Sequence, residues 1–219
     1  MQTQRKSGGI AAFYMAAAYI VAMPYFIFIF QVPEGAGAAE RLVAVTQAWQ
    51  WQYLMELVVY VVFGLALIVL ASSLHERLGG ATNPLMKIAT PIAYIWSGLL
   101  IASGMIYNVG MGKAIALNAT DHAAAAALWE AVDCISSGLS GNGEIVGGSW
   151  MLLVSLVALR SRRFSTALNV IGLSVAIVGI AAVIPPLKDL AYVFGIGQIV
   201  WFIILGFSLL KKDPMENKS

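Results

Sequence analysis

Apolar residues gather in six long stretches along the chain, and nearly all charged residues lie in the segments between them. The stretches cover about residues 9–31, 53–74, 88–109, 142–159, 168–184 and 190–210. A helix that rises about 1.5 Å per residue needs about twenty residues to cross a hydrocarbon core about 30 Å thick, and each stretch approaches or exceeds that length. The pattern predicts an all-α fold, in which residues 1–219 form one domain with a bundle of six transmembrane helices.

Basic residues are unequally divided between the segments on the two sides of such a bundle. One side carries Arg5, Lys6, Arg77, Lys87, Arg160, Arg162, Arg163, Lys211, Lys212 and Lys218. The other side carries only Arg41, Lys113 and Lys188. Because cytoplasmic segments are enriched in lysine and arginine, we expect both termini to be cytoplasmic and the protein to lie in the inner (plasma) membrane.

The N-terminal stretch has a second interpretation. Arg5, Lys6, the apolar run and the small residues 36–38 also resemble the three regions of a cleavable signal peptide. The apolar run is longer than the roughly fifteen residues typical of a signal sequence. We therefore favour a retained first helix with a kink at Pro24.

The third connection of the chain, over residues 110–140, is external and is the only long one, and it has an amphipathic pattern. Four apolar residues recur there at helical spacing: Leu128, Val132, Ile135 and Leu139. Glu130 and Asp133 fall on the opposite face of the same helix. We expect a short amphipathic helix over about residues 121–139, capped by Thr120 or Asp121 and lying on the outer surface.

Composition supports the membrane class. Hydrophobic residues make up 60% of the chain and charged residues 11%, with a mean hydropathy of +0.82. A soluble domain usually contains about a quarter charged residues. These values exclude a sizeable soluble domain and make the lipid bilayer the first expected partner. Other membrane subunits or a small amphiphile are further expected partners.

The sequence contains no recognisable catalytic or metal-binding motif. His75 and His122 fall on opposite sides of the expected membrane, and the single cysteine, Cys134, cannot form an intrachain disulfide. Phosphate-binding glycine loops, nucleotide-binding fingerprints and helical zinc motifs are also absent. We therefore predict no catalytic residue and no metal site, the sequence identifies no cofactor, and we expect no nucleic-acid partner.

Glu144 is the most unusual residue, because it enters an apolar helix as an ionisable group. Counted at 1.5 Å per residue from the cytoplasmic charges, Glu144 lies about 24 Å, Glu56 about 28 Å and Asn108 about 31 Å above the inner boundary. Burying such groups costs several kcal/mol unless they have partners, so they are candidates for function. If they converge laterally, they line a vestibule that opens outward, with Glu144 at its rim.

Three more polar residues complete the candidate binding set. They are Asn142, Tyr60 and Gln198. Glu144 could equally be a boundary residue that caps its own helix, and for Glu56 a solvated group at the membrane interface is the favoured alternative.

Three tryptophans are expected near the middle of the bilayer. Trp96, Trp150 and Trp201 lie about 14 to 15 Å above the inner boundary by the same count. They could form the floor of a ligand pocket with their indole N–H groups, but packing between helices is the favoured interpretation.

Three segments together resemble a known family. They are residues 97–105 (Ser-Gly-Leu-Leu-Ile-Ala-Ser-Gly-Met), 143–150 (Gly-Glu-Ile-Val-Gly-Gly-Ser-Trp) and 194–202 (Phe-Gly-Ile-Gly-Gln-Ile-Val-Trp-Phe). The chain resembles an uncharacterised family of bacterial multi-pass membrane proteins, the domain of unknown function 4386 type, over most of its length. The resemblance implies a membrane-spanning architecture and no particular activity.

These observations favour a non-enzymatic membrane protein. It would be either an accessory subunit or a binder of a small amphiphile in the outward-facing vestibule. A small transporter and an intramembrane enzyme that uses one outer carboxylate are the alternatives, and a purely structural role is the simplest one.

Overall fold

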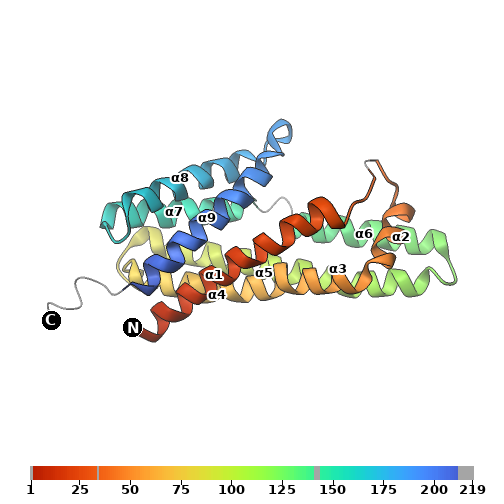
Figure 1. The fold of residues 1–219 in the computed structure, drawn as a ribbon, viewed down its shortest axis with the longest axis horizontal. Helices are drawn as coiled ribbons and strands as arrows, with labels where there is room; N and C mark the ends of the chain where they lie inside the picture. The colour runs from red at the N-terminus through yellow and green to blue at the C-terminus, as the bar shows by residue number, and fades with distance from the viewer. Residues whose placement is uncertain (1, 34, 141–143, 212–219) are drawn as a thin grey trace.

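The computed structural model describes residues 2–33, 35–140 and 144–211, and these residues are almost entirely helical (Figure 1). No strand occurs in these three ranges. The predicted all-α fold is confirmed, and each of the six apolar stretches is helical over most of its described length.

Six helices form a closed ring. They are α1 (Gln2–Pro24), α4 (Phe63–Arg77), α5 (Pro84–Leu117), α7 (Glu144–Ser161), α8 (Thr166–Ala181) and α9 (Leu190–Leu210). The contacts run from α1 to α4, α5, α7, α8 and α9 in turn, and α9 packs back against α1. Figure 1 shows the start of α1 and the end of α9 at the same end of this bundle.

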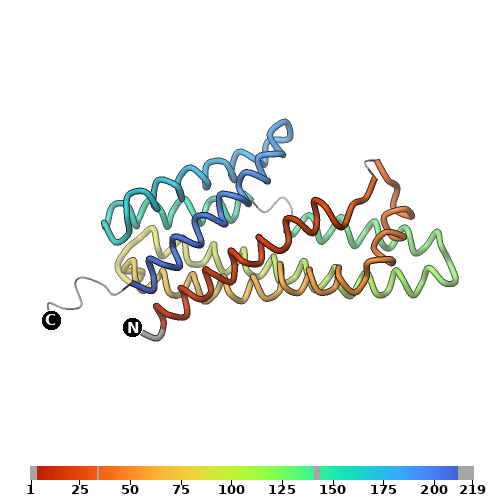
Figure 2. Tube along the Cα trace, in the orientation of Figure 1, coloured from red at the N-terminus to blue at the C-terminus, as the bar shows by residue number. Residues whose placement is uncertain are grey.

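The chain also forms an extension beyond one end of the ring. We use this name for α2 (Ala38–Gln47), α3 (Trp49–Glu56), α6 (His122–Ser140) and residues 106–117 of α5. With 34 residues, α5 is about 51 Å long at 1.5 Å per residue, so it runs through both the ring and the extension. Figure 2 shows the Cα trace of α6 returning antiparallel beside the far half of α5.

Each part has its own hydrophobic core. The bundle core includes Ala12, Met15, Leu67, Leu70, Ala93, Trp150, Val154 and Phe202. The extension core consists of Leu42, Val45, Met111, Ala114, Ala125, Trp129 and Val132, with Phe30, Ile106 and Tyr107 packed against it. The two cores follow each other along α5, so α5 links them rigidly.

The helix boundaries follow the signals in the sequence. Asn83 accepts hydrogen bonds from the backbone N–H groups of Leu85 (3.0 Å) and Met86 (3.4 Å), and α5 starts at Pro84. Asp121 accepts one from the backbone N–H of Ala124 (2.9 Å), which confirms the predicted cap of the 121–139 helix.

The regular α-helix is interrupted at two places by a wider π-helical turn. At Pro24, α1 changes into the π-helix η1 (Tyr25–Ile29), where the sequence predicted a kink. The helix that starts with α3 passes through the π-helix η2 (Leu57–Val62) before it continues as α4. Both π-helices lie where the ring meets the extension.

The buried face of α6 overlaps the predicted apolar stripe at Val132 but is rotated relative to it. Its buried residues are Ala125, Trp129, Val132 and Ser136. Ile135, expected on the buried face, is 54% exposed. The helix packs closely along α5, and small residues at the contact, such as Ala125 and Ser136, permit that approach. The buried face of α6 therefore packs against α5.

By length and composition, five helical segments within the described residues are apolar enough to cross a membrane. They are Gln4–Ile29, Trp49–Arg77, Pro84–Leu117, His122–Ser161 and Leu190–Leu210. The segment His122–Ser161 combines α6 with α7 and includes residues outside the described ranges. Thr166–Ala181 is equally apolar but shorter. Such helices are those of a membrane protein.

Candidate functional site

A layer of polar side chains lies between the two hydrophobic cores. It consists of Gln52 and Glu56 on α3, Ser103 and Asn108 on α5, and Ser136 on α6, all of them buried. Along the chain, each of them lies between a residue of one core and a residue of the other: Gln52 and Glu56 between Val45 and Phe63, Ser103 and Asn108 between Leu100 and Met111, and Ser136 between Val132 and Trp150. We call this group the polar layer.

Gln52 and Glu56 lie on the same face of α3, one turn apart. Gln52 is 0% exposed and Glu56 is 4% exposed. Both amide atoms of Gln52 and the Oε2 atom of Glu56 have no hydrogen-bond partner within the described residues. Buried polar groups in folded proteins are almost always paired, so three such atoms on one helix face mark a site that needs a partner.

Asn108 approaches the same face from α5. Its Nδ2 donates to the backbone carbonyl of Tyr53 (3.2 Å), while its Oδ1 has no partner within the described residues. One turn earlier on α5, Gly104 lies against the backbone carbonyl of Glu56. The antiparallel course of the two helices therefore places Asn108 near Gln52 and Gly104 near Glu56.

Serine hydroxyls fix α6 to this layer. Ser103 Oγ donates to the carbonyl of Ser136 (3.0 Å), and Ser136 Oγ donates to the carbonyl of Ser103 (3.2 Å). The two hydroxyl oxygens are 2.8 Å apart. These reciprocal bonds satisfy the serines internally, so they hold the helices together and do not contribute open hydrogen-bonding groups.

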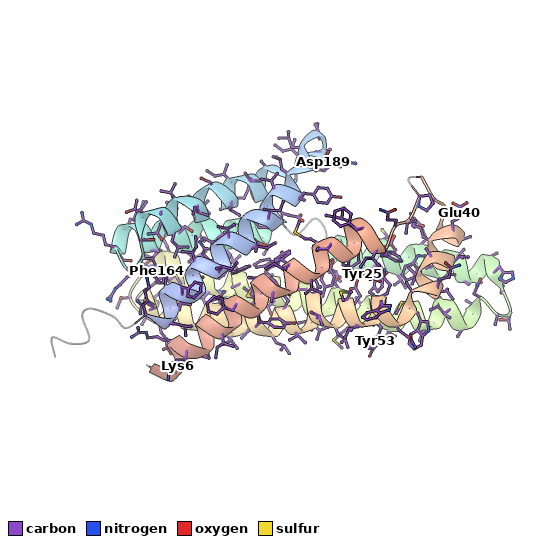
Figure 3. The ribbon with its side chains drawn as sticks, in the orientation of Figure 1. Lys6, Tyr25, Glu40, Tyr53, Phe164 and Asp189 are labelled. Atoms are coloured by element: carbon purple, nitrogen blue, oxygen red, sulfur yellow. The ribbon has the colours of Figure 1, made fainter. Side chains whose placement is uncertain are left out.

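Aromatic side chains lie next to the polar layer, where Tyr107 is within electrostatic range of both Glu56 and Tyr25. Tyr25, on η1, is buried with an unpartnered hydroxyl, and the indole N–H of Trp129 also lacks a partner in the described part of the chain. Tyr107 packs edge-to-face on Trp129 with ring centroids 5.1 Å apart. Figure 3 labels Tyr25 and Tyr53, which lie on the segments that reach this region from α1 and α3. The site therefore combines apolar walls with hydrogen-bonding groups, as small-molecule pockets do.

Acidic groups predominate around the layer. Glu56 lies within electrostatic range of Asp133 on α6. Arg41 on α2 forms ion pairs with Glu130 and, at 3.8 Å, with Asp133. The positive charge of Arg41 is thus directed to α6, and no ion pair of Glu56 occurs among the described residues.

The predicted site residues do not all lie at one place in the structure. Glu56 and Asn108 come together in the polar layer, and Tyr60 on η2 lies within electrostatic range of both Glu56 and Glu144. Glu144 is half-buried at the first turn of α7. Asn142 lies outside the described residues.

Gln198 belongs to the bundle rather than to the polar layer. It is fully buried on α9, and its Nε2 donates to Met151 Sδ on α7 at 3.6 Å. Its Oε1 has no partner within the described residues. Gln198 is therefore a separate buried polar group.

The three tryptophans form a closed set of aromatic contacts with Phe63 and Phe202. We call these five residues the aromatic layer. Its ring-centroid distances are 6.3 Å for Phe63–Trp96, 5.9 Å for Trp96–Trp150, 5.8 Å for Trp150–Trp201, 5.3 Å for Trp201–Phe202 and 6.2 Å for Phe202–Phe63. These residues come from α4, α5, α7 and α9 and are all buried in the bundle core. The aromatic layer thus fills the centre of the ring.

Six contributors to the site were absent from the predicted set: Gln52, Ser103, Ser136, Tyr25, Tyr107 and Trp129. The signal for Gln52 was available, because it shares a helical face with Glu56 and Tyr60. Tyr25 and Trp129 reach the site only through the π-helix after Pro24 and the packing of α6, which the local sequence does not specify. In the described residues there is also no group of three or more histidine, cysteine, aspartate or glutamate side chains that could hold a metal ion.

Comparison with protein-family models, with curated proteins and with solved structures finds no match to this chain.

Proposed function

We propose that the protein is a non-enzymatic multi-pass membrane protein that binds a small amphiphile in the polar layer. In this proposal the six ring helices cross the membrane and the extension projects on the side opposite the termini. Residence in the bacterial inner membrane is part of the proposal and follows from the family resemblance.

The distribution of charge supports this placement. Figure 3 shows Lys6 and Phe164 at the end of the bundle where α1 begins, and it shows Glu40 in the extension. Phe164 directly follows Arg162 and Arg163 in the sequence. The basic connections Arg77 to Lys87 and Arg160 to Arg163 lie at the same end as Lys6. The positive-inside rule then makes this end cytoplasmic.

The proposal counts six crossing helices, because it places α6 outside the membrane and lets the shorter α8 cross it. The helix α6 packs beside the part of α5 that runs beyond the ring, whereas the 16 residues of α8 pack between α7 and α9 within the ring. An even number of crossings returns the C-terminus to the side of the N-terminus, as Figure 1 shows for the two ends.

The observation that carries the proposed binding function is the set of unpartnered atoms on Gln52, Glu56 and Asn108. A buried polar group without a partner costs about 1–3 kcal/mol, and more when it is charged. The polar head of an amphiphile would supply the missing partners, and its apolar part would contact Tyr25, Tyr107 and Trp129.

Native mass spectrometry of the protein released from lipid nanodiscs tests this function. We expect a bound amphiphile on the wild type, and we expect Glu56→Gln to reduce its occupancy at least about tenfold, equivalent to about 1.4 kcal/mol of binding free energy. Asp189→Asn is the matched control, because Asp189 is exposed in the connection before α9. An unchanged adduct on a correctly folded Glu56→Gln protein would contradict the proposal.

A further inference from the structure

A pocket lies on the bundle surface between α4 and α5, at the end of the bundle where α1 begins. Its volume is about 460 Å³. It is lined by Ser72, His75, Glu76, Lys87, Thr90, Pro91 and Tyr94. None of these residues belongs to the polar layer or to the aromatic layer, so this pocket is a separate site.

The polar wall of the pocket is held in place by hydrogen bonds between the two helices. The hydroxyl oxygens of Ser72 and Tyr94 are 3.0 Å apart, and His75 Nδ1 lies 2.7 Å from Thr90 Oγ1. Ser72 Oγ also donates to the carbonyl of Ile68 (2.8 Å), which leaves the Tyr94 hydroxyl as the donor to Ser72. The wall is therefore ordered before any ligand arrives.

The pocket presents one cation and one anion. Lys87, in the first turn of α5, is exposed and forms no ion pair among the described residues. Glu76, in the last turn of α4, also lines the pocket and accepts a hydrogen bond from the Gln4 side chain. A ligand that matches both residues carries a negative group and a positive group within one small head.

Apolar surface continues from the pocket toward the middle of the bundle. Ile68 and Val69 are exposed one turn before Ser72 on α4, and Ile95 is exposed one turn after Pro91 on α5. The helices are antiparallel, so these apolar residues lie on the same side of the pocket, away from the chain termini. From the end of the bundle inward, charged groups come first and apolar groups follow. A phospholipid in a membrane leaflet has the same order, with its charged head at the surface and its acyl chains deeper.

We infer that this pocket binds a phospholipid with a phosphoethanolamine head, in the leaflet on the side of the termini. Lys87 pairs with the phosphate, Glu76 accepts hydrogen bonds from the primary ammonium, and the acyl chains cover Ile68, Val69 and Ile95. The inference rests on the membrane placement proposed above, but it does not depend on the polar layer.

The charges distinguish this headgroup from the other common ones. A phosphoglycerol head offers no positive group to Glu76. A phosphocholine head is positive, but its quaternary ammonium has no N–H to donate, whereas a primary ammonium has three. Hydrogen bonds between charged groups are about twice as strong as neutral ones, so Glu76 favours ethanolamine over choline.

Lipid titration followed by native mass spectrometry tests the site. The purified full-length protein, in a mild detergent, is titrated separately with phosphoethanolamine, phosphocholine and phosphoglycerol lipids of the same acyl chains. We expect the wild type to bind the phosphoethanolamine lipid about tenfold more tightly than the other two. Lys87→Gln should weaken all three at least fivefold, whereas Glu76→Gln should abolish the preference for ethanolamine over choline. Lys113→Gln, near the far end of α5, is the matched control and should change nothing.

Three results would overturn the inference. They are equal binding of the three lipids by the wild type, unchanged selectivity in a folded Glu76→Gln protein, and equally tight binding of soluble O-phosphoethanolamine, which has no acyl chains.

Tyr94→Phe gives a second variant if Lys87→Gln does not fold, and it should weaken binding of the phosphoethanolamine lipid while sparing the fold. Failure of the protein to insert into vesicles would instead refute the membrane placement, so the two failures are distinguishable.

Discussion

At the scale of single residues, the polar layer depends on a glycine, Gly104, as much as on its polar side chains. A Cβ atom at Gly104 would lie 2.9 Å from Tyr60 Cβ and 3.0 Å from the carbonyl oxygen of Glu56. Both atoms belong to rigid parts of η2 and α3, so neither can move without shifting the helix. Gly104 therefore sets the distance between α5 and the backbone of α3 at Glu56.

We expect Gly104→Ala to destabilise the protein by about 1–3 kcal/mol, since overpacking a close helix contact has about this effect. Thermal unfolding in detergent, followed by circular dichroism, measures the change. Gly98→Ala on the same helix is the control, because no atom lies within 4 Å of its added Cβ. It should be neutral or stabilising by up to about 1 kcal/mol. Equal melting temperatures for both variants would show that the contact at Gly104 is loose.

At the scale of elements, η2 determines which residues of α3 face the site. A π-helix closes hydrogen-bonded turns between residues i and i+5, so it accommodates one more residue per turn than an α-helix. The backbone carbonyl of Val58 in η2 accepts a hydrogen bond from the Tyr14 hydroxyl (2.7 Å), and this contact ties η2 to α1. The wide turn sets the rotation of α3 relative to α4.

Deleting Val62, which is exposed, should convert η2 into α-helix and turn Gln52 by about 100° relative to α4. The test uses Gln52→Cys in a Cys134→Ser background. Its thiol should be protected from maleimide in the full-length chain, because Gln52 is fully buried, and should become reactive after the deletion. Val62→Ala should leave the thiol protected. Continued protection after the deletion would mean that the π-helix does not control the orientation of α3.

At the scale of the whole molecule, the single cysteine reports on the orientation of the extension. Cys134 is exposed on α6, far from the end that carries the termini. In the proposed topology, a membrane-impermeant maleimide should label Cys134 on intact spheroplasts. Thr166→Cys in a Cys134→Ser background lies at the opposite end, on the first residue of α8, and should be labelled only after lysis. The reverse labelling pattern would invert the proposed topology.

Most of the architecture was predictable because it follows from local signals. The apolar stretches, the cap at Asn83, the cap at Asp121 and the break at Pro24 each depend on a few neighbouring residues. The face of α6 was not predictable in the same way. Large residues such as Ile135 dominate an amphipathic pattern, whereas close packing on α5 selects the small side chain of Ser136.

The candidate site was predictable only in part, for a similar reason. Counting residues from the charged helix ends placed Glu56 and Asn108 at similar depths, and they do lie on adjoining helices. Depth does not specify lateral position, and the predicted set also included Gln198, which lies within the bundle. Tyr25 and Trp129 enter the site through tertiary packing that no local pattern encodes.

The aromatic layer limits the routes by which a molecule bound at the polar layer could enter and leave. Five buried side chains fill the centre of the ring between the polar layer and the cytoplasmic end, so a bound molecule in the proposed topology must leave by the route through which it entered. Its occupancy then equilibrates with the concentration in one compartment only. In the proposed topology, such a protein would respond to the composition of the outer side and would carry out no transport against a gradient.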